Sequence, residues 1–350
     1  MDSLAHIAIH CSQFPERVRQ DLFSSLRARR INHKFHYDSI KQTQQWLALH
    51  QAYSPSRTDP QCAAIYDRSF VEMAQRFTGD EVHVLGLGCG GGQKDTRLAK
   101  LLMDSGKKVS YTPLDVSTAM VLVARQAALQ VLGTERCFPL VCDLATATDL
   151  PAVLDNWPPA LNLSSNRPAR PSRLITFFGM MPNFEPEEIL PRLAALLRPG
   201  EHLLCSANLA PGPDYAAGVQ RILPLYDNAL TRRWLMIFLL NLGLETTDGE
   251  LEFVIEEGTH GLKRIVTYFR FDAARSIQIE DEKFAFKKGE SVRLFFSYRY
   301  TPALVRAGLN DHGLEVIQEW LAPSGEEGVF LVQRAERQGE AERGKAERGL

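Results

Sequence analysis

Residues 82–92 read Val-His-Val-Leu-Gly-Leu-Gly-Cys-Gly-Gly-Gly and carry the strongest structural signal in the sequence. An apolar run stops abruptly there at five glycines within seven positions. Glycine is needed where a ligand lies directly against the backbone, because a side chain would obstruct it. The stretch predicts a buried strand whose carboxyl end turns into a nucleotide-binding loop, with a tight turn that binds no ligand as the alternative.

On both sides of this loop, short apolar runs alternate with amphipathic helical segments. The apolar runs, which we predict to be strands, span residues 82–87, 108–114, 137–144, 174–178 and 203–207. The helical segments between them span residues 94–102, 117–132 and 185–197. Strands separated by helices of about 12 residues indicate βαβ units. We therefore expect an α/β protein with a parallel sheet covered on both faces.

The later part of the chain departs from this alternation. Residues 250–297 read as a block of antiparallel strands, which does not continue a doubly wound sheet and predicts an inserted subdomain. Residues 314–320 and 328–333 then read as a final antiparallel pair. Such an ending is typical of a methyltransferase-type Rossmann fold, whereas a dehydrogenase-type fold would end in another parallel strand.

The glycine loop by itself is compatible with two cofactors. Gly86, Gly88 and Gly91 satisfy the Gly-x-Gly-x-x-Gly fingerprint of dinucleotide-binding proteins. Gly86, Gly88 and Gly90 equally satisfy the looser loop of enzymes that use S-adenosylmethionine (SAM). A nicotinamide oxidoreductase is therefore a rival to a SAM-dependent enzyme.

Two carboxylates favour SAM. Asp115 ends the second predicted strand, where its side chain can accept hydrogen bonds from both ribose hydroxyls of either cofactor. Its alternative role is that of a carboxylate at the N-terminus of the helix that Ser117 caps. Asp143 ends the third strand, where SAM enzymes often bind the adenine amino group. Together with the antiparallel ending, the two positions favour SAM over a nicotinamide cofactor.

The composition limits the class of partner. Lys plus Arg number 40 against 42 for Asp plus Glu, so the sequence predicts no overall attraction to nucleic acid or to an anionic membrane. The most apolar stretch, residues 234–240, is far shorter than the roughly 20 residues of a membrane-spanning helix, and residues 1–13 lack a targeting pattern. The six cysteines and nine histidines show no metal-ligand spacing. We expect no metal site and a reducing, cytoplasmic compartment.

Residues 177–186 read Phe-Phe-Gly-Met-Met-Pro-Asn-Phe-Glu-Pro and resemble a segment of the histidine-specific Nα-methyltransferases, the SAM-dependent enzymes that open ergothioneine biosynthesis. Six further pieces resemble that family in order and spacing. They are Phe-His-Tyr-Asp at 35–38, Tyr-Ser-Pro-Ser-Arg at 53–57, Lys-Asp-Thr-Arg at 94–97, Pro-Leu-Asp-Val-Ser at 113–117, Tyr-Asp at 226–227, and Gly-Glu at 289–290 leading to Ser-Tyr-Arg-Tyr-Thr-Pro at 297–302. The resemblance extends over about residues 20–334.

The resemblance implies a Rossmann-like class I methyltransferase sheet with a second, α+β substrate-binding domain. We expect the methyltransferase domain to comprise residues 61–210 and 298–334. The substrate-binding domain would comprise residues 1–60 and 211–297. The Ala-Glu-Arg repeats of residues 335–350 have no apolar face and predict a disordered tail.

The resemblance also implies a reaction and its residues. The reaction is methyl transfer from SAM to the α-amino group of a free amino acid. The implied cofactor-binding residues are Gly86, Gly88, Gly90 and Lys94 around the loop and the methionine end, Asp115 at the ribose, and Asp143 with Leu144 at the adenine. The implied substrate-binding residues are Tyr53, Asn183 at the amino group, Tyr226 at the carboxylate, Phe295 and Ser297, with Asn183 and Tyr37 as the candidate catalytic residues. Asn183 could otherwise cap a helix beginning at Phe184, Tyr226 could be an ordinary core or surface tyrosine, and bulk water could replace Tyr37 as the base.

Three positions depart from the family pattern. Phe295 stands where the histidine enzymes have a Glu that binds the imidazole together with the Ser that matches Ser297, and Ser54 replaces a second tyrosine. Gly86 stands where many SAM enzymes place an acidic residue. Histidine is the family's default substrate, but an aromatic or modified amino acid of the tryptophan type is a serious rival. A non-catalytic SAM-binding protein is a further alternative, and the sequence predicts no oligomeric state.

Overall fold

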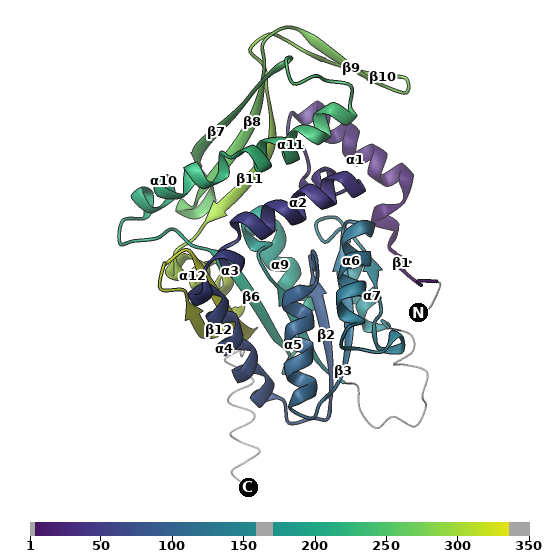
Figure 1. The fold of residues 1–350 in the computed structure, drawn as a ribbon, viewed down its shortest axis with the longest axis vertical. Coiled ribbons are helices and arrows are strands. Elements are labelled where there is room, and N and C mark those ends of the chain that lie inside the picture. The colour runs from purple at the N-terminus through teal and green to yellow at the C-terminus, as the bar shows by residue number, and fades with distance from the viewer. Residues whose placement is uncertain (1–3, 159–170, 336–350) are drawn as a thin grey trace.

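The computed structural model describes residues 4–158 and 171–335. Its largest element is an eight-stranded sheet with the order β1-β4-β3-β2-β5-β6-β13-β12 (Figure 1). The strands are β1 (Ala8–Ile9), β2 (Glu81–Leu87), β3 (Lys108–Asp115), β4 (Leu140–Val141), β5 (Ser172–Phe177), β6 (His202–Asn208), β12 (Leu314–Leu321) and β13 (Glu327–Arg334). The first six pair in parallel, whereas β13 is antiparallel to both of its neighbours, β6 and β12. This sheet confirms the predicted fold class and its antiparallel ending.

Helices cover both faces of the large sheet. One face packs against α4 (Pro60–Arg76), α5 (Gln93–Asp104) and α6 (Thr118–Ala128), and the other against α7 (Leu150–Asp155), α9 (Pro186–Leu196) and α12 (Pro302–Asn310). Alternate strand residues serve the two cores, since Leu203 and Cys205 of β6 face α9 whereas Leu204 faces α4. The central strands are buried on both sides, as is usual for a parallel sheet.

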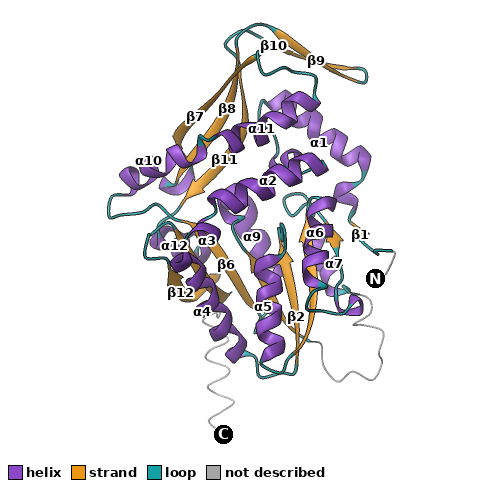
Figure 2. Cartoon of the chain, in the orientation of Figure 1, coloured by secondary structure: helices purple, strands orange, loops and turns teal. Residues whose placement is uncertain are grey.

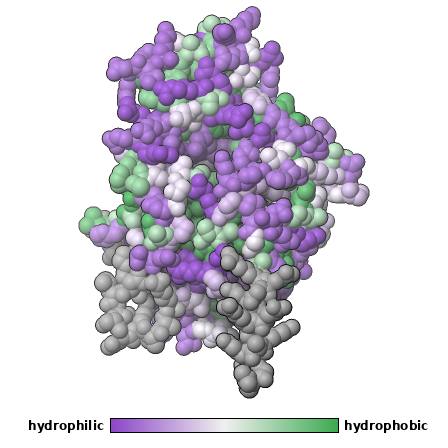
Figure 3. Space-filling view, turned by 180° about the vertical axis from the view of Figure 1, so that it is seen from behind, coloured by the Kyte–Doolittle hydropathy of each residue, from purple (hydrophilic) through white to green (hydrophobic). Residues whose placement is uncertain are grey.

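A second, α+β part lies above the carboxyl ends of the central strands (Figures 1 and 2). It contains the antiparallel strands β7 (Gly249–Glu257), β8 (Lys263–Phe271) and β11 (Ser291–Arg299), and the hairpin β9 (Arg275–Ile279) with β10 (Glu282–Phe286). Its helices are α1 (Pro15–Ala28), α2 (Ile40–Tyr53), α10 (Tyr215–Tyr226) and α11 (Ala229–Asn241), and α3 (Pro55–Thr58) follows α2. A separate aromatic-rich core, including Phe23, Trp234, Phe238 and Phe269, holds it together. The face shown in Figure 3 is mainly hydrophilic, with hydrophobic residues in small separate groups.

Some details differ from the simple pattern of the sequence. The strand expected over residues 137–144 is ladder-paired only at Leu140–Val141, with a single further bridge at Cys137. β1 belongs to residues 1–60 but pairs with β4 of the large sheet, and β11 extends to Arg299 across the proposed 297/298 boundary. The tail beyond Ala335 lies outside the described residues. Within residues 4–158 and 171–335, no helix has the length and apolar character required to cross a membrane.

A buried lysine ties the N-terminal segment to the edge of the sheet. Lys34, in the short helix η2 (His33–His36), places its Nζ 2.6 Å from an Asp21 carboxylate oxygen and 3.1 Å from one of Asp143. The Lys34 and Asp143 side chains are both buried. The backbone N–H of Asp143 also donates to Ser12 Oγ at 3.0 Å. The carboxyl end of β4 is thus covered by residues that precede α4, the first helix that packs on the large sheet.

A second buried carboxylate joins three central strands. Asp95 of α5 accepts hydrogen bonds from the Thr176 hydroxyl at 2.7 Å and the Tyr111 hydroxyl at 2.8 Å. A methyl group at position 86 would overlap this carboxylate, so Gly86 leaves the space that Asp95 fills. Burial raises the pKa of Asp95 to about 6, although both hydroxyl donors act in the opposite direction.

Lys34→Met is expected to destabilise the protein by about 3–5 kcal/mol, because it leaves two carboxylates close together without their cation. Urea unfolding measures the change. Arg17→Met is the matched control, since Arg17 makes a half-exposed pair with the same Asp21 and should cost less than about 1 kcal/mol. Equal losses of unfolding free energy in the two variants would show that the buried ion pair contributes no more to stability than the half-exposed one.

Asp95→Asn is expected to change how stability depends on pH. Because the native pKa of about 6 lies above the ordinary value of 3.8, the folded state binds more protons than the unfolded state between these values. Stability should therefore fall as pH rises from about 4 to about 6, by on the order of 3 kcal/mol, and the variant should lack this fall. Urea midpoints across this range measure it. Asp104→Asn, at an exposed position of α5, is the control that should keep the wild-type slope.

Candidate active site

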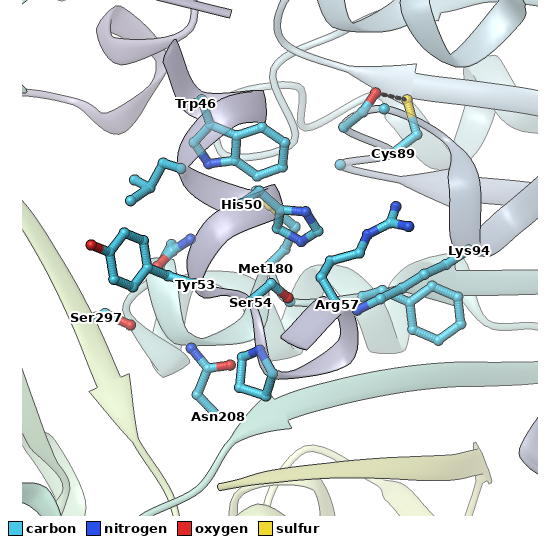
Figure 4. Close-up of a pocket in the computed structure, with 18 of the residues that line it drawn as sticks. Trp46, His50, Tyr53, Ser54, Arg57, Cys89, Lys94, Met180, Asn208 and Ser297 are labelled. Carbon is cyan, nitrogen blue, oxygen red and sulfur yellow. Dashed lines mark hydrogen bonds between the residues drawn. The ribbon is translucent and has the colours of Figure 1, made fainter. Parts of the chain in front are cut away.

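One pocket lies between the large sheet and the second part of the protein (Figure 4). The large sheet contributes the carboxyl ends of β2, β3, β5 and β6, and the second part contributes α2, α10, α11 and β11. Ten of the thirteen residues predicted from sequence line it: Tyr37, Tyr53, Gly88, Gly90, Lys94, Asp115, Asn183, Tyr226, Phe295 and Ser297. Residues more than 250 positions apart thus meet at one site.

The glycine loop is closely packed on two sides. Gly88 and Gly90 have φ values of 58° and 51°, which favour glycine over other residues. A Cβ at Gly88 would lie 2.6 Å from Cγ of Met180, and one at Gly90 would lie 3.2 Å from the Trp46 ring. At Gly88 and Gly90 the loop can therefore present only backbone to a bound molecule.

Asp115 stands at the end of β3 beside this loop. One of its oxygens accepts from the backbone N–H of Gly90 and the other from that of Ser117, each at 3.0 Å. Burial raises the pKa of Asp115, and these backbone donors oppose the rise. Each carboxylate oxygen can accept a further hydrogen bond, so the group can still bind a diol. It therefore serves the helix N-terminus and remains available to a ligand.

Three predicted cofactor residues do not line the pocket: Gly86, Asp143 and Leu144. The space beside Gly86 is filled by the side chain of Asp95, which itself lines the pocket. A carboxylate from α5 thus lies beside the strand position where the sequence lacks an acidic residue. Asp143 accepts from Lys34 and from the Ala145 N–H at 2.9 Å, and unlike Asp115 it is buried away from the pocket. The contact between Lys34 and Asp143 joins distant parts of the chain, so the local sequence does not reveal it.

Of the face of α2 that covers the loop, sequence reasoning identified only Tyr53 and missed the other three residues. Trp46, Leu49, His50 and Tyr53 all line the pocket, and their i, i+3, i+4, i+7 spacing is the signal that could have identified them. The imidazole of His50 stacks on Trp46 with centroids 4.9 Å apart. Burial, then the charges of Lys94 and Arg57, lower the pKa of His50 to about 3, so it is neutral at neutral pH.

Opposite charges meet at one end of the pocket. Lys94 Nζ donates to the Tyr66 hydroxyl at 2.8 Å and lies 3.6 Å from the buried Glu327 carboxylate. Burial lowers the pKa of Lys94, and the Glu327 charge opposes this. Arg57 lies on the same side in Figure 4, across the pocket from Tyr53 and Ser297. This end suits a zwitterionic group, since it offers both cations and a carboxylate.

The opposite end is largely aromatic. The Phe295 ring lies 5.6 Å from that of Trp234 and 6.3 Å from that of Tyr226, measured between centroids. Behind it, His33 stacks on Phe295 at 5.0 Å. Ser297 supplies a hydroxyl, which accepts from the Tyr226 hydroxyl at 2.9 Å.

Asn183 closes the short helix η4 (Met181–Asn183) and faces the same pocket. The next helix, α9, begins at Pro186 and has Glu185 as its N-cap residue. Asn183 is therefore not the helix cap that the sequence offered as its alternative role. Its side chain makes no hydrogen bond within residues 4–158 and 171–335, which leaves it available to a ligand.

Comparison with solved structures finds methyltransferases of low identity. CcbJ methyltransferase from Streptomyces caelestis is 15% identical, with 78% of this chain and 89% of that chain covered and a TM-score of 0.36. A SAM-dependent methyltransferase from Methanosarcina mazei is 15% identical, with coverage of 76% and 98% and a TM-score of 0.40. The Burkholderia thailandensis 1,6-didemethyltoxoflavin-N1-methyltransferase, solved with S-adenosylhomocysteine, is 12% identical, with coverage of 84% and 91% and a TM-score of 0.38.

No curated protein matches the chain. The sequence model of a protein family, in contrast, matches residues 17–334, which include the glycine loop, α2 and all three strands of the smaller sheet. This match agrees with the pocket, in which a glycine loop and a strand-end carboxylate are joined to a second cavity wall. The chain belongs to the family of histidine-specific, SAM-dependent methyltransferases.

Proposed function

We propose that this protein transfers a methyl group from SAM to the α-amino group of a free amino acid. One observation carries the proposal. The glycine loop with Asp115, which suits a nucleoside, opens into the same pocket as Asn183 and the aromatic wall around Phe295. Cofactor and acceptor can therefore meet within one site.

The donors present fit SAM. Gly88 and Gly90 offer backbone against which the cofactor can lie, and Asp115 retains acceptor capacity for the two ribose hydroxyls. Lys94 and Glu327 offer opposite charges for the methionine carboxylate and ammonium groups. Bound SAM supplies a methyl group made electrophilic by the adjacent sulfonium. The chain must then mainly align the acceptor, and such positioning can contribute roughly 7–11 kcal/mol.

Asn183 suits the alignment of a neutral amine. Its amide oxygen can accept from the amine N–H without adding a negative charge, which would favour the unreactive ammonium form. Tyr37 suits a different role from that of a base. Burial, then the Asp115 charge, raise the pKa of Tyr37, so its phenol stays protonated and can donate a hydrogen bond but cannot take a proton. We therefore assign Tyr37 to orientation, with water accepting the amine proton.

Phe295 argues against an imidazole as the side chain of the acceptor. Phe295 offers no acceptor for an imidazole N–H, and a buried donor left unpaired loses a charge-assisted hydrogen bond. Histidine is the default acceptor, and an aromatic amino acid is the second candidate, which the ring cluster of Phe295, Trp234 and Tyr226 favours.

Purified protein incubated with SAM and a pool of free amino acids tests the proposal, with methylated products detected by mass spectrometry. Asp115→Ala should weaken SAM binding at least about tenfold, because it removes the diol acceptor. Asn183→Ala should bind SAM normally and lose turnover. SAM binding with no methylated product in the wild type would favour a non-catalytic SAM-binding protein. Normal turnover by Asn183→Ala would remove Asn183 from the mechanism.

Phe295→Glu should raise activity towards histidine at least about tenfold, because it restores an acceptor for the imidazole N–H beside Ser297. The same variant should lose activity towards an aromatic amino acid. Steady-state rates with the two substrates measure this exchange. Phe296→Glu places the same charge on the neighbouring residue, which does not line the pocket, and should not increase histidine methylation. An unchanged ratio of rates would locate the specificity elsewhere.

A further inference from the structure

Arg299 is a buried cation that no carboxylate of the described residues neutralises. It is the last residue of β11, lines the pocket, and is only 6% exposed. Its guanidinium donates to the Tyr226 hydroxyl oxygen at 2.9 Å and to the Leu209 carbonyl at 3.3 Å. Its Nε is buried without a hydrogen-bond partner. Within residues 4–158 and 171–335, Arg299 forms no ion pair.

Other arginines of the same small sheet are neutralised. Arg264 of β8 pairs with Glu185 at 2.8 Å and with Glu256 at 3.2 Å, and Arg293 of β11 lies 3.9 Å from Glu185. Burying a charge without an opposite charge nearby is unfavourable, so the fold retains Arg299 at a cost. A bound anion would remove that cost.

The hydrogen bonds around Arg299 run in one direction. A guanidinium can only donate, so the Tyr226 oxygen accepts from Arg299 and the Tyr226 O–H donates to Ser297 Oγ. The hydrogen of Ser297 has no acceptor in the described part of the chain, and Ser297 lines the pocket. This wall therefore presents a donor whose strength a nearby cation increases.

We propose that Arg299 and Ser297 form the binding site for a carboxylate of the methyl acceptor. The inference rests on the proposed function and deepens it, since it names a group that the acceptor carries. Tyr226, to which the family resemblance assigns the carboxylate, already donates its only hydrogen to Ser297. It is a positioning residue that joins the two. The aromatic rings of Phe295 and Trp234 exclude water nearby and strengthen the attraction between guanidinium and carboxylate.

Phenylacetate and its uncharged analogue phenylacetamide test the site without requiring methyl transfer. Their phenyl ring suits the aromatic wall, and saturation-transfer NMR measures their affinities for the full chain in the presence of S-adenosylhomocysteine. Phenylacetate should bind at least about tenfold more tightly than phenylacetamide, as expected for a charge-assisted hydrogen bond. Equal affinities would overturn the proposal.

Substitutions test whether Arg299 causes the preference for phenylacetate over phenylacetamide. Arg299→Met should abolish the preference for phenylacetate, Arg299→Lys should keep part of it, and Ser297→Ala should reduce it without removing a charge. Arg270→Met, on the solvent-exposed surface of β8, is the matched control that should keep it. Circular dichroism verifies that each variant folds. If Arg299→Met does not fold, Ser297→Ala still tests the site. A preference that survives both Arg299→Met and Ser297→Ala would place the carboxylate elsewhere.

Two sources of the carboxylate are separated in the methylation assay. An acceptor whose α-carboxamide analogue loses turnover binds through its α-carboxylate, whereas an acceptor that loses turnover only when its side-chain carboxylate is amidated binds through its side chain. Failure of this site is distinguishable from failure of the proposed function. Amino-acid methylation with equal probe affinities would refute the Arg299 site alone. A probe preference with no methylated amino acid would refute the proposed reaction and leave the carboxylate site standing.

Discussion

The absence of a side chain at Gly86, Gly88 and Gly90 is the constraint on which the site depends. The space beside Gly86 is filled by Asp95 from α5, the space beside Gly88 by Met180, and the space near Gly90 by Trp46 from α2. Three elements from different parts of the chain thus pack against one backbone segment. A Cβ at Gly86 or Gly88 would overlap its neighbour, and one at Gly90 would crowd Trp46. The loop consequently sets the distances of η4 and α2 from the large sheet.

The second wall of the pocket follows from the geometry of one strand. Phe295, Ser297 and Arg299 alternate along β11, so their side chains share a face. A register shift between Arg293 and Phe295 precedes them. Such irregularities re-aim the side chains that follow, and here they precede the three residues that reach the pocket. The aromatic ring, the hydroxyl and the buried cation therefore arrive together as one surface.

Much of the fold and part of the site were accessible from sequence because their signals are local. The glycines of residues 86–92, the alternation of strands and helices, and the strand-end Asp115 are all read within short windows. The contacts of Asp143 were not accessible, because Lys34 lies 109 positions away and reaches it only in the folded chain. The same holds for Asp95, whose carboxylate accepts from Tyr111 and Thr176 and fills the space beside Gly86 only in the folded chain. Trp46 and His50 have a helical spacing, but spacing alone does not distinguish a pocket from a core.

The position of β11 has an evolutionary consequence. The groups that suit the cofactor come from the large sheet, α3 and α5, whereas the three groups that we propose to face the acceptor occupy alternate positions of a single strand in the inserted part. Substitutions at these three positions can alter the shape and charge of the acceptor compartment while the glycine loop and Asp115 stay as they are. A lineage can therefore acquire a new acceptor through a few changes in one strand and inherit its cofactor chemistry intact.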